Sequence, residues 1–384
     1  MVMLNEPYPF GNTNGRWGHA LLKGLAGRGY DVRCLAVTTH EEWAKGAHDL
    51  FRSTGVRLTF YPYHRARAAR DTAWFRRKWR SVRQPFSYAF SDGLKRDLDA
   101  ALGEGYDVLH LDVTWSGYLA AARERALTSV HNLQRLDLAR VWHPSGRFLA
   151  SKFLMGRTEK TLLARLRNIH TTTRRLAGAV SALNRAASVY VVPIALDASL
   201  YDFSQEDRTP EPVIGFLANM MWNPGYLAAR RLITRIFSKV RARRPDARLL
   251  LAGWGARRSL RRYLDVPGVE IVENVPDARP YFTRLQVLAY PLPQGSGMMI
   301  KVLEAMAYGI PVVTTTEGIE GYAAEDGRHA LIADDDERFA ERVAQALDDA
   351  DLRRRLRRNA RRLAEEHHSP QSTAAAFERV YQCL

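Results

Sequence analysis

Short apolar runs alternate with helical segments along the second half of this 384-residue chain, and this alternation restricts its fold more than any other feature. The runs span 211–218, 247–254, 269–274, 285–292, 310–315 and 329–334. Short apolar strands separated by helices pair in parallel and are covered by helices on both faces of the sheet. We therefore expect residues 195–365 to form one doubly wound α/β domain.

The first half repeats this rhythm less regularly. Strand candidates lie at 2–6, 31–37, 56–63, 107–113, 127–132 and 187–197, with a helix at 15–30 and a long helical region at roughly 150–176. The last residues predict a helix that begins at Ser369-Pro370, because proline is favoured in the first helical turn. These patterns predict a second Rossmann-like domain over residues 1–194.

Composition is that of a globular protein, with 46% apolar and 26% charged residues. The two cysteines, Cys34 and Cys383, provide neither a disulfide framework nor a cysteine zinc site. The sequence shows no apolar stretch of about 18 residues and no signal peptide, so we expect a cytoplasmic protein without a membrane-spanning helix.

Nearly all of the excess of positive over negative charge lies in one half of the chain. Of the net charge of +16, residues 1–194 contribute 30 Lys+Arg against 15 Asp+Glu, whereas residues 195–384 hold 27 against 26. This asymmetry predicts that the first domain meets something anionic. A non-enzymatic nucleic-acid binder is one alternative, but neither a zinc finger nor an RNA-recognition signature occurs, and we expect no nucleic-acid partner.

Two doubly wound domains in tandem place the carboxyl ends of two sheets across a cleft, and ligands bind at those ends. Candidate site segments are therefore those that directly follow strands. They are 5–16, 110–115, 131–135, 219–224, 253–258, 293–304 and 316–322. Asn219 and Gly253 open two of these segments and are candidate ligand contacts.

The segment "GSGMMIKVLEAMAYGIPVVTT", residues 295–315, is the most informative of them. Glycines let the backbone approach a ligand, and the helix that follows presents free N–H groups and a partial positive charge, which together with Lys301 suit a phosphate. Glu304 lies one turn on and suits the two hydroxyls of a ribose. The alternative is an ordinary lysine–glutamate pair on a solvated face, but the rest of this helix is apolar and offers no such face.

These residues resemble the donor-site motif of the family 4 glycosyltransferases, which are retaining enzymes of the GT-B fold. The segments "GVEIVENVPDARPYFTRLQVLAYPLPQG", "HALIADDDERFAERVAQAL", "PYPFGNTNGRWGHALLKGLAGRGYDV" and "SVHNLQ" extend the resemblance over nearly the whole chain. The resemblance implies a C-terminal domain that binds a nucleotide-sugar and an N-terminal domain that binds the acceptor. It also implies that the last helix, 366–384, completes the N-terminal domain, and that neither a metal nor another cofactor is required.

Carried over to this sequence, Lys301 pairs with the donor diphosphate and is counted as catalytic, while Glu304 binds the nucleotide ribose. The glutamate that the family commonly has eight positions earlier is Ser296 here, which leaves Gln294 and the amides of Gly295 and Gly297 to contact the donor sugar. The sequence also departs from the family at 218–225, "ANMMWNPG", where no cation stands. Lys301 is therefore the main expected phosphate cation.

The resemblance also assigns roles in the first half. His131, which ends a strand, corresponds to a histidine near the transferred sugar and is the second catalytic candidate. Gly11 and Gly15 bracket the loop that approaches the sugar, and Arg16 opens the next helix, although a plain β–α turn is the alternative. Glu320 is a candidate for the donor sugar hydroxyls. His110 and Asp112 are interpreted as supporting or acceptor-facing residues.

Residues 65–83, "RARAARDTAWFRRKWRSVR", mix eight Lys/Arg with aromatic residues. Such a segment binds an anionic membrane surface or remains a solvated basic helix. The first interpretation places the enzyme on the inner face of the plasma membrane, held there by Arg76, Arg77, Lys78 and Arg80. The acceptor would then be a glycan or lipid-linked intermediate of cell-surface polysaccharide or glycolipid synthesis. A small-metabolite or natural-product glycosyltransferase and a nucleotide-sugar epimerase are the alternatives.

Overall fold

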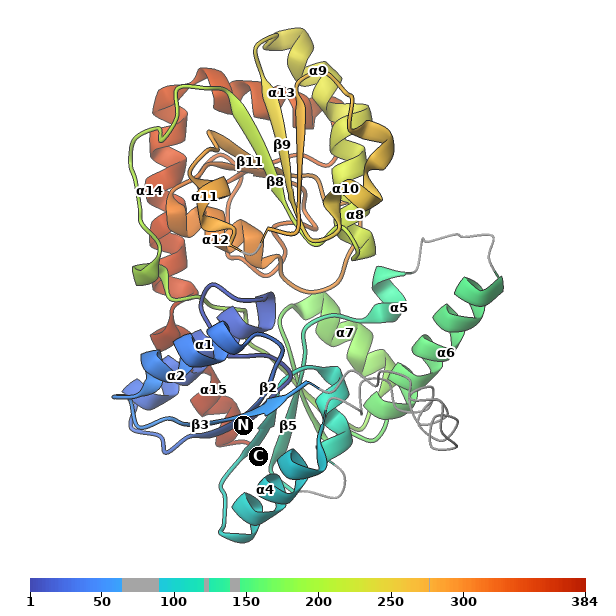
Figure 1. The fold of residues 1–384 in the computed structure, drawn as a ribbon, viewed down its shortest axis with the longest axis vertical. Coiled ribbons are helices and arrows are strands. Elements are labelled where there is room, and N and C mark those ends of the chain that lie inside the picture. Colours follow the sequence, from blue (N-terminus) through green and yellow to red (C-terminus); the bar gives the residue numbers. More distant parts are fainter. Residues whose placement is uncertain (64–89, 121–123, 139–145, 276) are drawn as a thin grey trace. The chain divides into compact units, whose positions relative to one another are not determined.

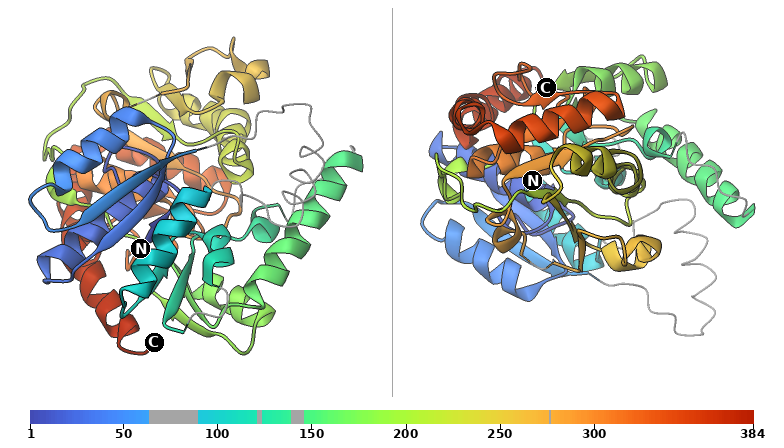
Figure 2. Two further views of the ribbon diagram at one scale, coloured as in Figure 1. Left: turned by 60° about the horizontal axis from the view of Figure 1, so that its bottom comes forward. Right: turned by 90° about the horizontal axis from the view of Figure 1, so that it is seen from above.

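The computed structural model describes residues 1–63, 90–120, 124–138, 146–275 and 277–384, which divide into two units (Figure 1). The N-terminal unit comprises Met1–Ala195 and Pro370–Leu384, and the C-terminal unit comprises Leu196–Ser369. Each unit is built on one parallel sheet with helices packed on both of its faces (Figures 1 and 2). This confirms the predicted α/β architecture of two doubly wound sheets.

The sheet of the N-terminal unit has seven strands in the order β3-β2-β1-β4-β5-β6-β7, all paired in parallel. The order reverses between β1 and β4, as a doubly wound sheet requires. The strands are β1 (Val2–Met3), β2 (Arg33–Thr38), β3 (Arg57–Pro62), β4 (Leu109–Leu111), β5 (Ala126–Val130), β6 (Asn168–Thr171) and β7 (Ser188–Val191).

The helices of this unit connect successive strands and cover both faces of the sheet. They are α1 (Thr13–Gly27), α2 (Glu41–Phe51), α4 (Asp92–Gly103), the 3-10 helix η2 (Thr114–Ala120), α5 (Gln134–Asp137), α6 (Gly146–Leu163) and α7 (Arg174–Leu183). The expected long helical region at 150–176 is wrong, because α6 ends at Leu163 and strand β6 follows before α7. Strand β6 is only four residues long and includes three polar residues, Asn168, His170 and Thr171, so it lacks the apolar run that marks the other strands.

The last helix, α15 (Pro370–Tyr381), belongs to the N-terminal unit. It packs against α1 so closely that a Cβ on Gly24 would lie 2.0 Å from the carbonyl oxygen of Pro370, so only glycine fits there. The Glu378 carboxylate accepts hydrogen bonds from Arg28 and from the Tyr30 hydroxyl, the latter at 2.9 Å. Residues from the two ends of the chain therefore complete one unit.

A chain of hydrogen bonds between buried side chains ties α15 to the sheet. Nε2–H of His170 donates to the carbonyl oxygen of Val192 at 2.8 Å, which leaves Nδ1 to accept from the Ser129 hydroxyl at 2.8 Å. Ser129 Oγ in turn accepts from Nε2 of His110 at 2.8 Å, and Nδ1 of His110 accepts from the Tyr381 hydroxyl at 2.7 Å. One backbone carbonyl thus sets the direction of every bond in the chain.

This direction requires both histidines to be neutral, and burial favours that state. Desolvation lowers the pKa of His170 to about 3 and holds the pKa of His110 well below its ordinary value. His110 is 3% exposed. Its two ring nitrogens therefore serve the core of the N-terminal unit.

The sheet of the C-terminal unit has six parallel strands in the order β10-β9-β8-β11-β12-β13. Each of the six runs predicted from the sequence contains one of them. They are β8 (Val213–Leu217), β9 (Arg248–Gly253), β10 (Val269–Glu273), β11 (Val287–Tyr290), β12 (Val312–Thr314) and β13 (Leu331–Ile332).

The helices of this unit begin at the carboxyl ends of the strands or follow one another at the end of the unit. The first is interrupted by a π-helical turn, η4 (Leu232–Ile236), between α8 (Asn223–Arg231) and α9 (Phe237–Arg243). The others are α10 (Ala256–Ser259), α11 (Arg279–Phe282), α12 (Ile300–Tyr308), α13 (Asp336–Asp348) and α14 (Ala350–His367), with short 3-10 turns at Ala198–Leu200 and Arg261–Tyr263.

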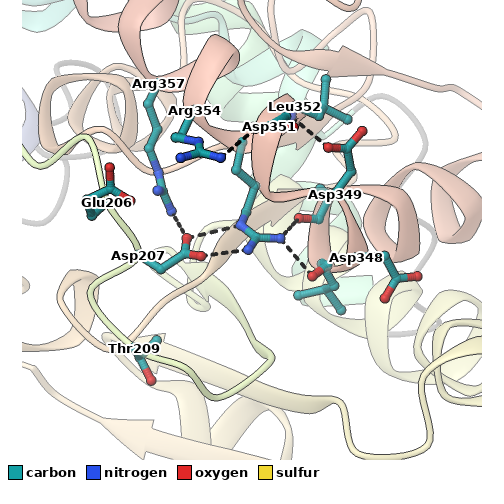
Figure 3. Close-up of polar contacts among 12 residues, drawn as sticks. Glu206, Asp207, Thr209, Asp348, Asp349, Asp351, Leu352, Arg354 and Arg357 are labelled. Atoms are coloured by element: carbon teal, nitrogen blue, oxygen red, sulfur yellow. Dashed lines mark hydrogen bonds and ion pairs between the residues drawn. The ribbon is translucent and has the colours of Figure 1, made fainter.

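Arginines on α14 fasten the segment that enters this unit (Figure 3). The Asp207 carboxylate accepts from Arg353, with Oδ2 at 2.6 Å from the Arg353 guanidinium, and from Arg357. Both arginines are buried, with side chains 6% and 3% exposed, and Arg353 also donates to the carbonyl oxygens of Ala346 and Leu347. Asp207 therefore compensates two buried charges at once.

We predict that Asp207→Ala lowers the free energy of unfolding of the C-terminal unit by roughly 3 kcal/mol at pH 7, because two buried guanidinium groups lose their carboxylate. Chemical denaturation followed by circular dichroism measures this. The matched control is Glu206→Ala, an exposed neighbour, which we expect to change stability by less than about 0.5 kcal/mol.

A comparison of the wild-type protein with Asp207→Ala as a function of pH tests whether Asp207 acts as an ion. Burial alone raises the pKa of this carboxyl, but the hydrogen bonds and charges of Arg353 and Arg357 outweigh it, so the pKa lies below its ordinary value. A carboxyl whose pKa is depressed by folding stabilises above the unfolded pKa of about 3.9 and loses that contribution as pH falls through the folded pKa. The difference between wild type and Asp207→Ala should therefore shrink below about pH 4; a constant difference down to pH 2 would contradict an ionic role.

Candidate functional site

The order of strands in the C-terminal unit reverses between β8 and β11, and ligands of doubly wound sheets bind at such a point, beyond the carboxyl ends of the strands. Two loops meet there: residues 218–222 after β8 and residues 291–299 after β11. A Cβ on Gly295 would lie 3.7 Å from Cβ of Pro224, the second residue of α8, so the second loop lies against the start of the helix that follows the first loop. The segment 295–315, which the sequence analysis identified as a ligand site, therefore begins at the point where ligands of such sheets bind.

The segment that follows α12 holds the loop 291–299 in place through hydrogen bonds. The Thr315 hydroxyl donates to the carbonyl oxygen of Leu292 at 2.8 Å, and the Tyr322 hydroxyl donates to that of Met299 at 2.9 Å. Gly297 adopts a φ of 80°, which favours glycine. The loop and the beginning of α12 are therefore fixed by the protein itself.

Lys301 and Glu304 form a close pair in the first turns of α12. Lys301 Nζ lies 2.8 Å from Glu304 Oε2, with side chains 17% and 3% exposed, and 5.5 Å from the centre of the Phe282 ring. The other eight residues of the helix are all buried, Glu304 among them. The pair is therefore a largely buried one, unlike the solvated pair that was the alternative.

The remaining donor-site candidates of the C-terminal unit fall into three places. Gln294 is half-buried and Ser296 is buried, both in the loop before α12; Glu320 is half-buried in the turn after β12. Asn219 is exposed, and its Oδ1 accepts from the backbone N–H of Met221 at 2.9 Å. The structure therefore brings Gln294, Gly295, Ser296 and Gly297 together on one loop.

Gly253, at the end of β9, has a role in the fold. Its φ is 149°, and a Cβ there would lie 1.9 Å from the carbonyl oxygen of Ala218. Only glycine permits this approach, which positions the β8 loop against β9. The two most exposed large apolar side chains described in this unit, Met221 and Trp254, follow the neighbouring strands β8 and β9. Both lie within candidate segments of the sequence, which did not single them out, although two glycines around Trp254 were a signal.

His131 lies at the carboxyl end of β5 in the N-terminal unit. Its Nε2 lies 2.7 Å from Oδ1 of Asp112, at the end of the neighbouring strand β4, and its ring packs edge-on against Trp17 with centroids 4.8 Å apart. The Asp112 side chain is fully buried, whereas that of His131 is 13% exposed. Because a carboxylate only accepts, Nε2 of His131 carries the proton, and the orientation of the ring is set.

The glycine-rich loop of the N-terminal unit precedes α1, whose N-cap is Asn12. Gly15 is required for packing, because a Cβ there would lie 2.3 Å from the carbonyl oxygen of Glu6. Gly11 is buried and lies against Trp43, and Arg16 is 6% exposed with its guanidinium 3.4 Å from the carbonyl oxygen of Phe10. Gly11 thus lies in the loop between β1 and α1, whereas Gly15 and Arg16 lie in the first turn of α1.

The four cations expected to contact a membrane surface lie outside the described residues; they are Arg76, Arg77, Lys78 and Arg80. Within the residues that the structure describes, no group of three or more His, Cys, Asp or Glu side chains is arranged to hold a metal ion. None of the described helices is both long and apolar enough to cross a membrane.

The sequence of the C-terminal unit matches a known protein family. Residues 211–349 match the family described as "Glycosyl transferases group 1". This segment contains β8 to β13 and therefore the whole of the loop and helix that carry Lys301 and Glu304. No curated protein matches the chain in sequence.

Solved structures show the same fold over the whole chain. A sucrose-phosphate synthase from Thermosynechococcus elongatus superimposes with a TM-score of 0.69 at 16% identity, covering 100% of this chain and 98% of that one. Anabaena HepE, in complex with UDP and glucose, gives 0.67 at 14% identity with 100% of both chains covered. WaaG, "a glycosyltransferase involved in lipopolysaccharide biosynthesis", gives 0.60 at 12% identity, covering 100% and 99%. The chain thus has the GT-B fold.

Proposed function

We propose that this chain, which has the GT-B fold and a segment similar to group 1 glycosyl transferases, transfers a sugar from a nucleotide-sugar donor to an acceptor hydroxyl with retention. The observation that carries the proposal is the largely buried Lys301–Glu304 pair at the point where the strand order of the C-terminal sheet reverses. The structures of HepE with UDP and with UDP-glucose support the choice of donor class.

In this proposal the donor diphosphate lies at the N-terminus of α12. The dipole of the helix favours negative charge at its N-terminus, and the ammonium of Lys301, the more exposed member of the pair, adds a point charge. Glu304 holds the Lys301 ammonium in place at 2.8 Å, and the ribose hydroxyls donate to the same carboxylate. No metal takes part.

Stabilisation of the departing diphosphate is then the main chemical task. A leaving diphosphate that gains charge in the transition state is bound more tightly there than in the ground state, which accelerates the reaction. The diphosphate itself takes the proton of the acceptor hydroxyl, so no protein base is needed. His131, oriented by Asp112, contacts the transferred sugar and contributes to positioning.

We predict that Lys301→Ala keeps its fold, at lower stability because Glu304 loses its Lys301 partner, and loses roughly tenfold to a hundredfold in kcat/KM, because a charge-assisted contact contributes roughly 1.5–3 kcal/mol. Glu304→Gln should mainly weaken nucleotide binding.

A thermal-shift panel of UDP-, GDP-, dTDP-, ADP- and CMP-sugars identifies the donor, which should add about 2.7 kcal/mol to the free energy of unfolding at 100 times its dissociation constant.

The control for Lys301 is Lys239→Ala, an exposed lysine of the same unit that pairs with Glu337. It should retain wild-type kinetics. Full transfer rates in both Lys301→Ala and Glu304→Gln would reject the donor site, and the absence of any shift in the nucleotide-sugar panel would reject the donor class.

We also predict that His131→Ala lowers kcat while leaving the affinity for the nucleoside diphosphate nearly intact, because the histidine acts on the sugar and not on the nucleotide. Single-turnover kinetics and calorimetry separate the two effects. His48→Ala, an exposed histidine on α2, is the control. An equal loss of diphosphate affinity in His131→Ala would contradict this placement.

For the acceptor we propose a glycan or lipid-linked intermediate of cell-surface polysaccharide or glycolipid synthesis, met at the inner face of the plasma membrane. The proposal rests on the sequence of residues 65–83 and on the charge excess of residues 1–194. The protein should sediment with anionic vesicles at low salt, dissociate at high salt, and bind less when Arg76, Arg77, Lys78 and Arg80 are changed to Ser. Absence of binding would favour a small soluble acceptor. Conversion of the nucleotide-sugar without any acceptor would favour an epimerase.

A further inference from the structure

Two large apolar side chains are exposed within the described residues of the C-terminal unit, and they lie on the loops after two neighbouring strands. Met221 is 52% exposed and follows β8, whereas Trp254 is 62% exposed and follows the neighbouring strand β9. The other large apolar residues described in this unit are buried or half-buried. A rare exposed apolar pair at the ligand-binding edge of a sheet points to something that covers it.

The position of Trp254 is fixed by its backbone. Its carbonyl oxygen accepts from the N–H of Met220 at 2.9 Å, and it stands between Gly253, with a φ of 149°, and Gly255, with a φ of 69°. The N–H of Gly255 donates to Oδ1 of Asn274 at 3.2 Å. The turn that presents the indole is therefore attached to both neighbouring loops.

Met221 lies against this turn. A Cβ on Gly255 would be 2.6 Å from Cγ and 2.8 Å from Sδ of Met221, so the side chain occupies the space that the glycine leaves open. The Ser259 hydroxyl lies 3.7 Å from the same sulfur atom. We call Trp254 and Met221 together the apolar platform; it is formed before any ligand is present.

The strand order places the apolar platform at a defined distance from the candidate phosphate site. Strand β9 is separated from β11 by β8 alone, and neighbouring strands are about 4.8 Å apart, so the two loops are separated by roughly 10 Å along the edge of the sheet. That separation suits a nucleotide whose phosphates lie at α12 and whose base lies beyond its ribose.

We propose that Trp254 stacks on the nucleobase of the donor. The proposal deepens the donor-site assignment and depends on it. A planar base is the chemistry that an exposed indole face recognises, and such stacking is tolerant of base identity because every base has a π-face. The platform therefore supplies affinity for the nucleoside, and discrimination between bases falls to other groups.

Calorimetry on the full chain tests this with UDP and ADP, and with inorganic pyrophosphate as a base-free competitor. Trp254→Ala should weaken the binding of whichever nucleotide the wild-type protein binds by about tenfold. The affinity for pyrophosphate, measured by competition with that nucleotide, should stay unchanged. Trp254→Phe should recover most of the affinity. Nucleotide binding should also quench a tryptophan emission component in wild type that is missing from Trp254→Phe.

The control variant is Phe153→Ala, an aromatic residue of the N-terminal unit that is 67% exposed and should leave nucleotide affinity unchanged. Unaltered nucleotide affinity in Trp254→Ala would overturn the stacking proposal but leave the donor site standing, because Lys301→Ala would still weaken binding. An equal loss of nucleotide and pyrophosphate binding would also overturn it, since it would indicate a displaced loop. Failure of wild type to bind any nucleotide would reject the donor site itself, and the stacking proposal with it.

Discussion

Burial of α12 on nearly every side is the constraint on which the candidate donor site depends. Lys301 is the one residue of this helix that is not fully buried, so a ligand can approach only its N-terminal end. At the other end, Gly309 caps the helix with a φ of 74°, and the Arg361 guanidinium donates to the carbonyl oxygen of Ala307 at 2.6 Å. The carbonyl end is thus satisfied by the protein, whereas the N–H end faces the loop at which the strand order reverses.

The arginines of α14 explain how this helix is held. Arg353, Arg357 and Arg361 are spaced four residues apart and therefore lie along one face of α14. They reach the segment from Tyr201 to Asp207 as well as α12, so one row of cations joins the entry segment to the helix that carries Lys301. The sequence shows the spacing of the arginines, but their partner Asp207 is 146 residues from Arg353, and no local pattern indicates such a pairing.

Local sequence patterns were sufficient to predict the elements that a single continuous stretch of residues forms. The strands of the C-terminal sheet and the loop before α12 could be predicted because apolar runs, glycines and a helix start are read within about ten residues. Strand β6 could not, since His170 and Thr171 interrupt its apolar pattern and the partners of His170 come from β5 and from Val192. The pairing of His131 with Asp112 and the contact between Met221 and the Trp254 turn depend on the order of strands, which no single segment encodes.

The two units stabilise their buried polar groups differently. In the C-terminal unit, buried arginines are paired with the carboxylate of Asp207. In the core of the N-terminal unit, His110 and His170 are neutral members of a directed hydrogen-bond chain that ends on a carbonyl. Asp112 differs, because Oδ1 is bonded to His131 but Oδ2 is buried without a partner among the described residues, and the following Val113 has a φ of 62°. A buried carboxylate beside a β-branched residue in the left-handed region costs stability on both counts. Such costs persist where a side chain must be held for a task, and the group held here is His131, at the open end of its strand.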